Sequence, residues 1–243
     1  MLRGIYAAAS GMVAQGIRQT ATSNNIANAS TPGYKRDIAV TESFSDVLTA
    51  ASQRRAIGTM GMLTSATRSY VDLSSGTAAA TDGQYDLAIM GEGFFAVETE
   101  AGVRYTRAGN FRPDAHGWLV TPDGARVLGE EGHIRAGLGF AVAADGTYYS
   151  KDEPGGKILI VAPTDYEGMT KAGGGLFDSA TMEQVAEGSV SVVQGVLESS
   201  NVNVVQEMVD MITGFRIYEA AQKAILSHDA MLDAAVNQVG KMA

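Results

Sequence analysis

The stretch from Asn203 to Val239 reads NVVQEMVDMITGFRIYEAAQKAILSHDAMLDAAVNQV and predicts one uninterrupted helix. Its apolar side chains recur at alternating steps of four and three residues, which is the heptad spacing of a helix that packs against other helices. The series consists of Val204, Met208, Met211, Phe215, Tyr218, Gln222, Ile225, Asp229, Leu232, Val236 and Val239. Asn203 is placed to cap the first turn, and no proline interrupts the run.

This helix has more apolar surface than one neighbour can cover. At about 1.5 Å per residue it is roughly 55 Å long, whereas a compact domain of this chain length has a radius of gyration of about 18 Å. Its first half carries a second apolar face at Val205, Val209 and Ile212, and two apolar faces need two sets of neighbours. Two interpretations stay open: a helix buried in this chain's own core, and an assembly helix covered by copies of itself or of close relatives.

A second helix is predicted from Leu2 to Asn28. One side carries Leu2, Tyr6, Ala9, Val13, Gly16 and Thr20, and Ile5 and Met12 lie beside it. Many of its side chains are small, which permits close approach of a partner helix, and Pro32-Gly33 stops it. Near its end, Asn24, Asn25 and Asn28 either lie in solvent or bond backbone groups at the helix end or amides on a neighbouring subunit.

The sequence pattern in the middle of the chain is typical of a β domain. Residues 34–81 are polar with little periodicity and predict an extended connector. Residues 82–179 alternate short apolar strands with Asp-Gly turns, which indicates an antiparallel β domain. Its expected core is Leu87, Ile89, Phe95, Tyr105, Trp118, Val120, Val127 and Ile160. Residues 180–196 are a return connector.

The predicted fold class is therefore mixed α and β. Residues 1–33 and 197–243 are the N- and C-terminal assembly helices, and they pair as a coiled coil around the inserted antiparallel β domain. Because the β domain is inserted between them, the two helices must meet in space.

Composition excludes several classes of function. The absence of cysteine excludes disulfides and thiolate metal sites, and a net charge of −9 argues against nucleic-acid binding. No apolar run of about 18 residues is present to span a bilayer. The N-terminus lacks the apolar core of a cleavable signal, so any export is expected to use a route without one.

No catalytic arrangement is found. The three histidines, His116, His133 and His228, are far apart, and we interpret them as solvated, with His228 on a polar flank of the last helix. Gly91-Glu92-Gly93 formally fits a dinucleotide motif but runs into a β-like stretch instead of a helix. We expect no enzyme activity, no cofactor and no metal.

Four stretches carry a resemblance to a known family. The run Asn24-Asn25-Ile26-Ala27-Asn28-Ala29-Ser30-Thr31-Pro32-Gly33-Tyr34 resembles the N-terminal motif of bacterial flagellar rod and hook proteins. Residues 195–203, GVLESSNVN, followed by 207–212, EMVDMI, are similar to the C-terminal motif of that family. Residues 85–95 and 105–111 resemble its central β-domain motifs. They occur in the family's order and cover about half the chain.

The resemblance implies a structural subunit of the flagellar basal-body rod, located in the periplasm, which polymerises helically and transmits torque from motor to hook. The implied partners are further copies, other rod subunits and the flagellar type III export apparatus. The short length and the opening residues 5–12 look most like the proximal-rod members. The alternatives are a distal-rod or hook subunit and, in another class, a dimeric periplasmic or surface module whose β domain binds a ligand.

We expect the terminal helices to make the assembly contacts and to be largely disordered in the monomer. The contact residues expected on the first helix are Leu2, Ile5, Met12, Val13, Asn24, Asn25 and Asn28. Those expected on the last helix are Val204, Met208, Met211, Phe215, Tyr218, Ile225 and Leu232.

Overall fold

The computed structural model describes residues 2–43, 64–137, 139–150, 153–166, 168–179, 181–186 and 188–240. The chain divides into two compact units, each built from segments distant in sequence. The helical unit comprises Met1–Ala27, Asp37–Tyr70 and Asn203–Ala243. The β unit comprises Asn28–Arg36 and Val71–Val202. The fold is mixed α and β, as predicted.

Two helices dominate the helical unit. Helix α1 spans Leu2–Ala27 and helix α3 spans Val204–Gly240, so both predicted helices are confirmed to within a residue or two. The predicted cap is also present, because Asn203 Oδ1 accepts hydrogen bonds from the backbone N–H groups of Val205 (3.1 Å) and Gln206 (3.2 Å). Strands β1 (Asp37–Ser43) and β2 (Thr64–Val71) form a two-stranded sheet, and β1 packs on α1.

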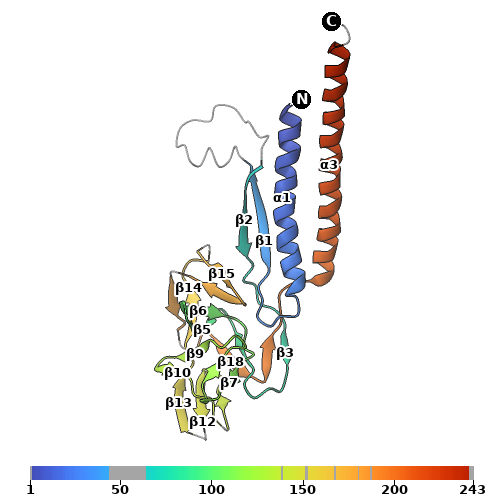
Figure 1. The fold of residues 1–243 in the computed structure, drawn as a ribbon. Coiled ribbons are helices and arrows are strands. Elements are labelled where there is room, and N and C mark those ends of the chain that lie inside the picture. The colour runs from blue at the N-terminus through green and yellow to red at the C-terminus, as the bar shows by residue number, and fades with distance from the viewer. Residues whose placement is uncertain are drawn as a thin grey trace. The chain divides into compact units, whose positions relative to one another are not determined.

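The two helices lie side by side and run antiparallel (Figure 1). Three close pairs fix this register: Asn25 near Glu207, Gln15 near Gly214, and Gly4 near His228. The last turns of α3 extend past the N-terminal end of α1 (Figure 1).

The β unit is an antiparallel assembly of short strands. Its largest sheet has the order β15-β16-β6-β5-β9-β8-β7, with β10 on β9, β14 on β5 and β17 on β14. These strands are β5 (Phe94–Thr99), β6 (Gly102–Thr106), β7 (Arg112–Pro113), β8 (Leu119–Val120), β9 (Arg126–Gly129), β10 (Gly132–His133), β14 (Ile160–Pro163), β15 (Thr170–Gly173), β16 (Leu176–Asp178) and β17 (Met182–Gln184). The β11–β13 sheet comprises β11 (Ala141–Val142), β12 (Thr147–Ser150) and β13 (Glu153–Lys157).

Two strand pairs close the β unit across a long sequence separation. Strand β18 (Ser191–Gln194) pairs antiparallel with β4 (Leu87–Met90), and β19 (Val196–Glu198) pairs antiparallel with β3 (Ala78–Ala80). The final residues of the unit therefore return to its first strands. Strands β1, β2 and β3 lie in the range predicted as an extended connector, and its central part, residues 44–63, is outside the described residues.

The core of the β unit consists of two apolar clusters, and the larger one includes Leu87, Phe95, Leu119, Val127 and Ile134, each fully buried. Six of the eight predicted core residues are buried, namely Leu87, Ile89, Phe95, Val120, Val127 and Ile160. The prediction is wrong for Trp118 and Tyr105, which are only half-buried. Leu119 and Ile134 fill the core beside Trp118, whose ring instead stacks under the guanidinium of Arg135.

Candidate assembly interface

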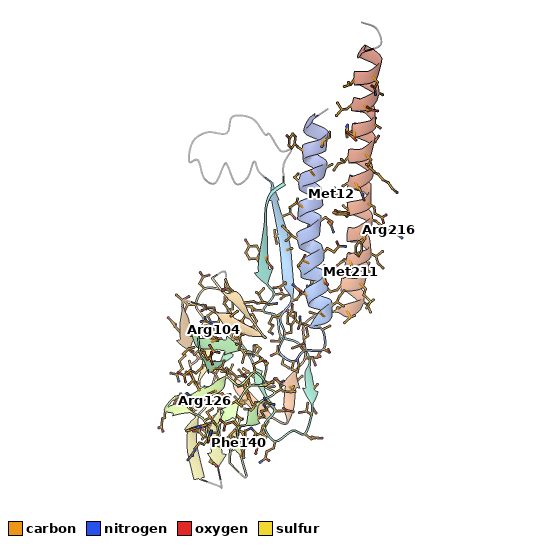
Figure 2. All side chains as sticks on the ribbon, in the orientation of Figure 1. Met12, Arg104, Arg126, Phe140, Met211 and Arg216 are labelled. Carbon is orange, nitrogen blue, oxygen red and sulfur yellow. The ribbon has the colours of Figure 1, made fainter. Side chains whose placement is uncertain are left out.

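One side of α3 faces α1. The least exposed positions along α3 are Glu207, Met211, Gly214, Ala221, Ile225, His228 and Leu232, which keep a heptad spacing. Gly214 sits against the side chain of Gln15, since a Cβ on Gly214 would lie 2.3 Å from Gln15 Nε2. Met211 points toward α1, whereas Arg216 points away from it (Figure 2).

The predicted heptad series meets α1 at only some of its positions. Met211, Ile225 and Leu232 are half-buried on the side that faces α1, and Tyr218 is at the edge of this side, 37% exposed. The other expected contact residues, Val204, Met208 and Phe215, are 36%, 49% and 51% exposed. They continue around α3 into the second apolar face at Val205, Val209 and Ile212, which are 72%, 51% and 55% exposed. We call these six exposed residues, from Val204 to Phe215, the open face of α3.

Helix α1 has the same two-sided character. Ile5 and Met12 are half-buried, and Figure 2 shows Met12 on the side toward α3. Val13 and Tyr6 are each 65% exposed and Ile17 is 42% exposed, and we call these three residues the open face of α1. The side chain of Leu2 lies outside the described residues.

A polar contact joins the C-terminal end of α1 to the N-terminal end of α3. Asn25, 1% exposed, accepts a hydrogen bond from the N–H of Asp37 (2.8 Å) and donates to the carbonyl of Asp37 (2.9 Å) and to Glu207 Oε2 (3.3 Å). Of the three alternatives, Asn25 therefore comes nearest to bonding backbone groups, which here belong to the first residue of β1. Asn24 is exposed, and Asn28 accepts from the Thr31 hydroxyl at 3.3 Å.

The prediction that His228 lies on a polar, solvated flank is wrong. His228 is half-buried against α1, where a Cβ on Gly4 would lie 2.9 Å from its Nε2. Its Nδ1 is buried and makes no hydrogen bond within the described part of the chain. Of the other two histidines, His116 is exposed and His133 forms an ion-pair contact with Glu98.

The β unit contains a buried ionic cluster, which we define as Lys35, Arg107 and Glu198. They are 1%, 4% and 5% exposed. Lys35 Nζ donates to Glu198 Oε1 at 2.7 Å, and Arg107 Nη1 lies 3.7 Å from Glu198 Oε2. Burial lowers the pKa of Lys35 and the pKa of Arg107, while the charge of Glu198 opposes both shifts.

The surroundings of this cluster join segments from both ends of the β unit. Glu198 Oε1 also accepts from the N–H of Gly76 (2.8 Å), and the Glu198 carbonyl accepts from the N–H of Gly33 (2.7 Å). Gly33 has φ +68°, and a Cβ there would lie 2.3 Å from the backbone nitrogen of Ala108, so only glycine fits. Asn201 Oδ1 accepts from the N–H of Arg36 at 2.8 Å.

Sequence reasoning missed this cluster. Lys35 sits in a polar stretch and Glu198 ends an apolar one, and at both places a charged side chain is normally solvated. The available signal was their position: Lys35 follows the Thr31-Pro32-Gly33-Tyr34 motif directly, and Glu198 lies inside the Gly195–Asn203 motif.

The β unit also has a partly open surface depression of about 560 Å³, whose lining includes Glu92, Thr164, Glu183 and Gln184. Small-molecule sites are typically enclosed and mostly apolar with a few polar groups. The lining also includes apolar Ala162, Pro163 and Val185, but the depression is partly open to solvent, so it is not the enclosed pocket that the ligand-binding alternative needs.

Two searches of the described residues give negative results. They contain no group of three or more His, Asp or Glu side chains arranged to hold a metal ion. None of the helices within the described ranges is both long and apolar enough to cross a membrane.

Family models match three successive parts of the chain. Residues 5–35 match the flagella basal body rod protein model, residues 88–176 match the flagellar hook protein FlgE/F/G D1 domain, and residues 193–239 match the flagellar basal body rod FlgEFG protein C-terminal model. The outer two matches contain most of α1 and most of α3, and they also include Lys35 and Glu198.

Whole-length relatives agree with these matches. The chain is 32% identical to the flagellar basal-body rod protein FlgG of Bacillus subtilis, over 98% of this chain and 99% of the relative. It is 33% identical to FlgF of Caulobacter vibrioides over 90% of both chains, and 34% identical to FlgF of Escherichia coli over 87% of this chain and 88% of the relative. The chain belongs to the family of flagellar basal-body rod proteins.

Proposed function

We propose that the chain is a structural subunit of the proximal flagellar rod that polymerises helically through α1 and α3 and transmits torque from motor to hook. Its partners are further copies and other rod subunits, and the flagellar type III export apparatus delivers it to the periplasmic side. The β unit is the outer module. The terminal helices order fully only on assembly.

The observation that carries this proposal is the open face on each helix. The three residues on α1 and the six on α3 are 36–72% exposed in the single chain. Monomeric soluble proteins rarely expose contiguous apolar patches of this kind, and such patches commonly mark protein–protein contacts. Helices with one side on each other and the other side on neighbours are suited to a tube built from many identical subunits.

The α1–α3 pair acts as a coiled coil in this proposal. The α3 side that faces α1 keeps heptad spacing, with small Gly214 where the helices approach closely and polar Glu207 at one end. The expected seam residues Met211, Tyr218, Ile225 and Leu232 then serve the intrachain pair. The expected residues Val204, Met208 and Phe215 serve contacts between subunits.

The proposal is tested by introducing a charged side chain on the open face of α3. Val209→Asp should abolish motility and rod assembly in cells that lack the native gene, because it places a carboxylate in a subunit contact. Thr213→Asp is the matched control, since Thr213 is exposed on the same helix and lies outside the open face. Wild-type motility of the Val209→Asp strain would refute assembly through this face.

The proximal position rests on the short chain and the resemblance of residues 5–12. In the resemblance, FlgF is the proximal-rod member. The alternative, a distal-rod subunit, is favoured by the Bacillus subtilis FlgG relative, which aligns over 98% of this chain, more than the FlgF relatives do. Deletion of the gene and imaging of basal bodies separates the two. Loss of the whole rod beyond its base supports the proximal position, and a retained proximal stub supports the distal one.

A further inference from the structure

The buried ionic cluster joins three segments that are far apart in the sequence. Lys35 and Glu198 are separated by 163 positions, and Arg107 comes from between them, at the end of β6. Lys35 precedes the helical unit's β1, and Glu198 ends β19, the last strand of the β unit. The cluster can form only when both ends of the β unit are in place.

Glu198 is the main negative charge beside the two cations of the cluster, and Asp72 and Glu92 favour the charges of Lys35 and Arg107 more weakly. Lys35 and Arg107 are two buried cations, and Glu198 is the one carboxylate within ion-pair distance of both among the described residues. Each cation disfavours the charge of the other, since the charge of Arg107 is among the causes that lower the pKa of Lys35. A β unit without Glu198 therefore buries two like charges, which is strongly unfavourable.

The residues next to Glu198 also form hydrogen bonds to residues 72–80 at the start of the β unit. Residues 196–198 supply the partner strand of β3, and the N–H of Ser199 donates to the carbonyl of Thr77 at 2.8 Å. Asn201 Nδ2 donates to the carbonyls of Asp72 (2.8 Å) and Ser74 (3.1 Å). Several backbone groups of residues 72–80 are therefore hydrogen-bonded only when this one short segment is in place.

We propose that Glu198 is a closure residue: the β unit does not hold its fold until residues 196–202 bring this carboxylate to Lys35 and Arg107. Folding of the β unit is therefore deferred until nearly all of the chain that precedes α3 is available. If the chain is exported as an extended polypeptide, which rests on the proposed function, closure postpones folding until the segment that carries Glu198 has passed.

The test uses the full chain and changes charge without changing shape. Glu198→Gln keeps a hydrogen-bond acceptor for Lys35 but removes the charge, and Glu100→Gln is the matched control, since Glu100 is exposed in the β unit. We expect amide exchange in Glu198→Gln to accelerate about a hundred-fold or more. The acceleration should extend to β5 and β9, neither of which contains or directly adjoins in sequence a residue of the cluster. Acceleration limited to residues 33–36, 74–77 and 196–202 would overturn the proposal.

A second variant gives a readout even when Glu198→Gln does not fold. Adding Lys35→Met to Glu198→Gln removes one of the two cations that Glu198 compensates, so it should restore protection of β5 and β9. If Glu198 made only a local packing contact, the double variant would lose a further contact and be less protected from exchange than Glu198→Gln. That result would refute the closure role. Because exchange is measured on the unassembled chain, a failure of the proposed rod function leaves the outcome unaffected.

Discussion

The two units bury their apolar side chains to very different extents. In the β unit, Phe95, Leu119 and Val127 are fully buried, and even the ionic cluster is enclosed and paired. In the helical unit, Val205, Ile212 and Phe215 are more than half exposed. The β unit buries most of its large apolar side chains within one chain, with Val103 and Tyr166 among the exceptions, whereas α1 and α3 each leave an apolar face exposed.

This difference indicates where the free energy of each unit comes from. Burial of apolar surface is the dominant favourable contribution to folding, and the β unit obtains it from its own strands. In a single chain, the helices of the helical unit bury apolar surface only where α1 packs on α3 and on β1. The rest of their stabilisation therefore depends on neighbouring subunits. Substitutions should therefore act on folding in one unit and on assembly in the other.

The largest expected effect is a backbone clash in the β unit. A Cβ on Gly109 would lie 1.6 Å from the carbonyl oxygen of Leu87, and both groups belong to paired backbone. Gly109→Ala should therefore abolish cooperative folding of the β unit, measured by the fluorescence of Trp118, the one tryptophan of the chain. The same substitution at Gly11 in α1 meets nothing within 4 Å and is the control. An unchanged unfolding midpoint for Gly109→Ala would contradict this geometry.

The next prediction compares the same substitution, phenylalanine to alanine, in the two units. Phe95→Ala should lower the free energy of unfolding of the β unit by about 3–5 kcal/mol, because it opens a cavity in a closed core. Phe215→Ala should change the stability of the unassembled chain by less than about 0.5 kcal/mol, because its ring is already 51% exposed. Phe215→Ala should nevertheless impair rod assembly, because Phe215 belongs to the open face of α3. Urea unfolding and motility complementation measure the two effects, and equal stability losses would remove the distinction between the units.

The buried ionic cluster should make the stability of the β unit depend on pH. The pKa of Lys35 is lower in the folded chain than the ordinary lysine value of 10.5, because burial disfavours its charge. Between these two pKa values the unfolded chain binds more protons, so Lys35 contributes stability that increases with pH. The increase is at most about 1.4 kcal/mol per pH unit for one proton. Lys35→Met should remove this contribution, and an identical pH dependence of urea midpoints in both proteins would contradict it.

Helix boundaries, the helix cap and the strand-and-turn pattern could be predicted from the sequence, because each depends only on residues that are close together in the chain. The boundaries of α1 and α3 follow from periodicity and from a proline-glycine stop, and Asn203 caps α3 as expected. The alternation of short strands and Asp-Gly turns gave the antiparallel β unit. Most of its core could be identified because apolar residues on alternate strand positions share one face.

The side of α3 that faces α1 could not be found in the same way. Hydrophobicity selects Met208 and Phe215, yet Gly214 and Glu207 take the positions toward α1. Glycine allows the helices to approach closely, and Glu207 has Asn25 as its partner, and both reasons depend on a helix distant in sequence. The buried Lys35–Glu198 pair was hidden for a similar reason, because a charge with a remote partner is indistinguishable in sequence from a solvated one.

The smallest expected effect concerns Gly16 in α1. A Cβ on Gly16 would meet nothing within 4 Å, so nothing in the described part of the chain requires glycine there. Gly16→Ala should therefore stabilise α1 in the unassembled chain by about 1 kcal/mol, since glycine is a poor helix former. In the rod, a neighbouring subunit that approaches α1 closely at Gly16 would meet the added methyl group. Helical content by circular dichroism should increase while motility falls, and an increase in both would show that no neighbour packs closely at this position.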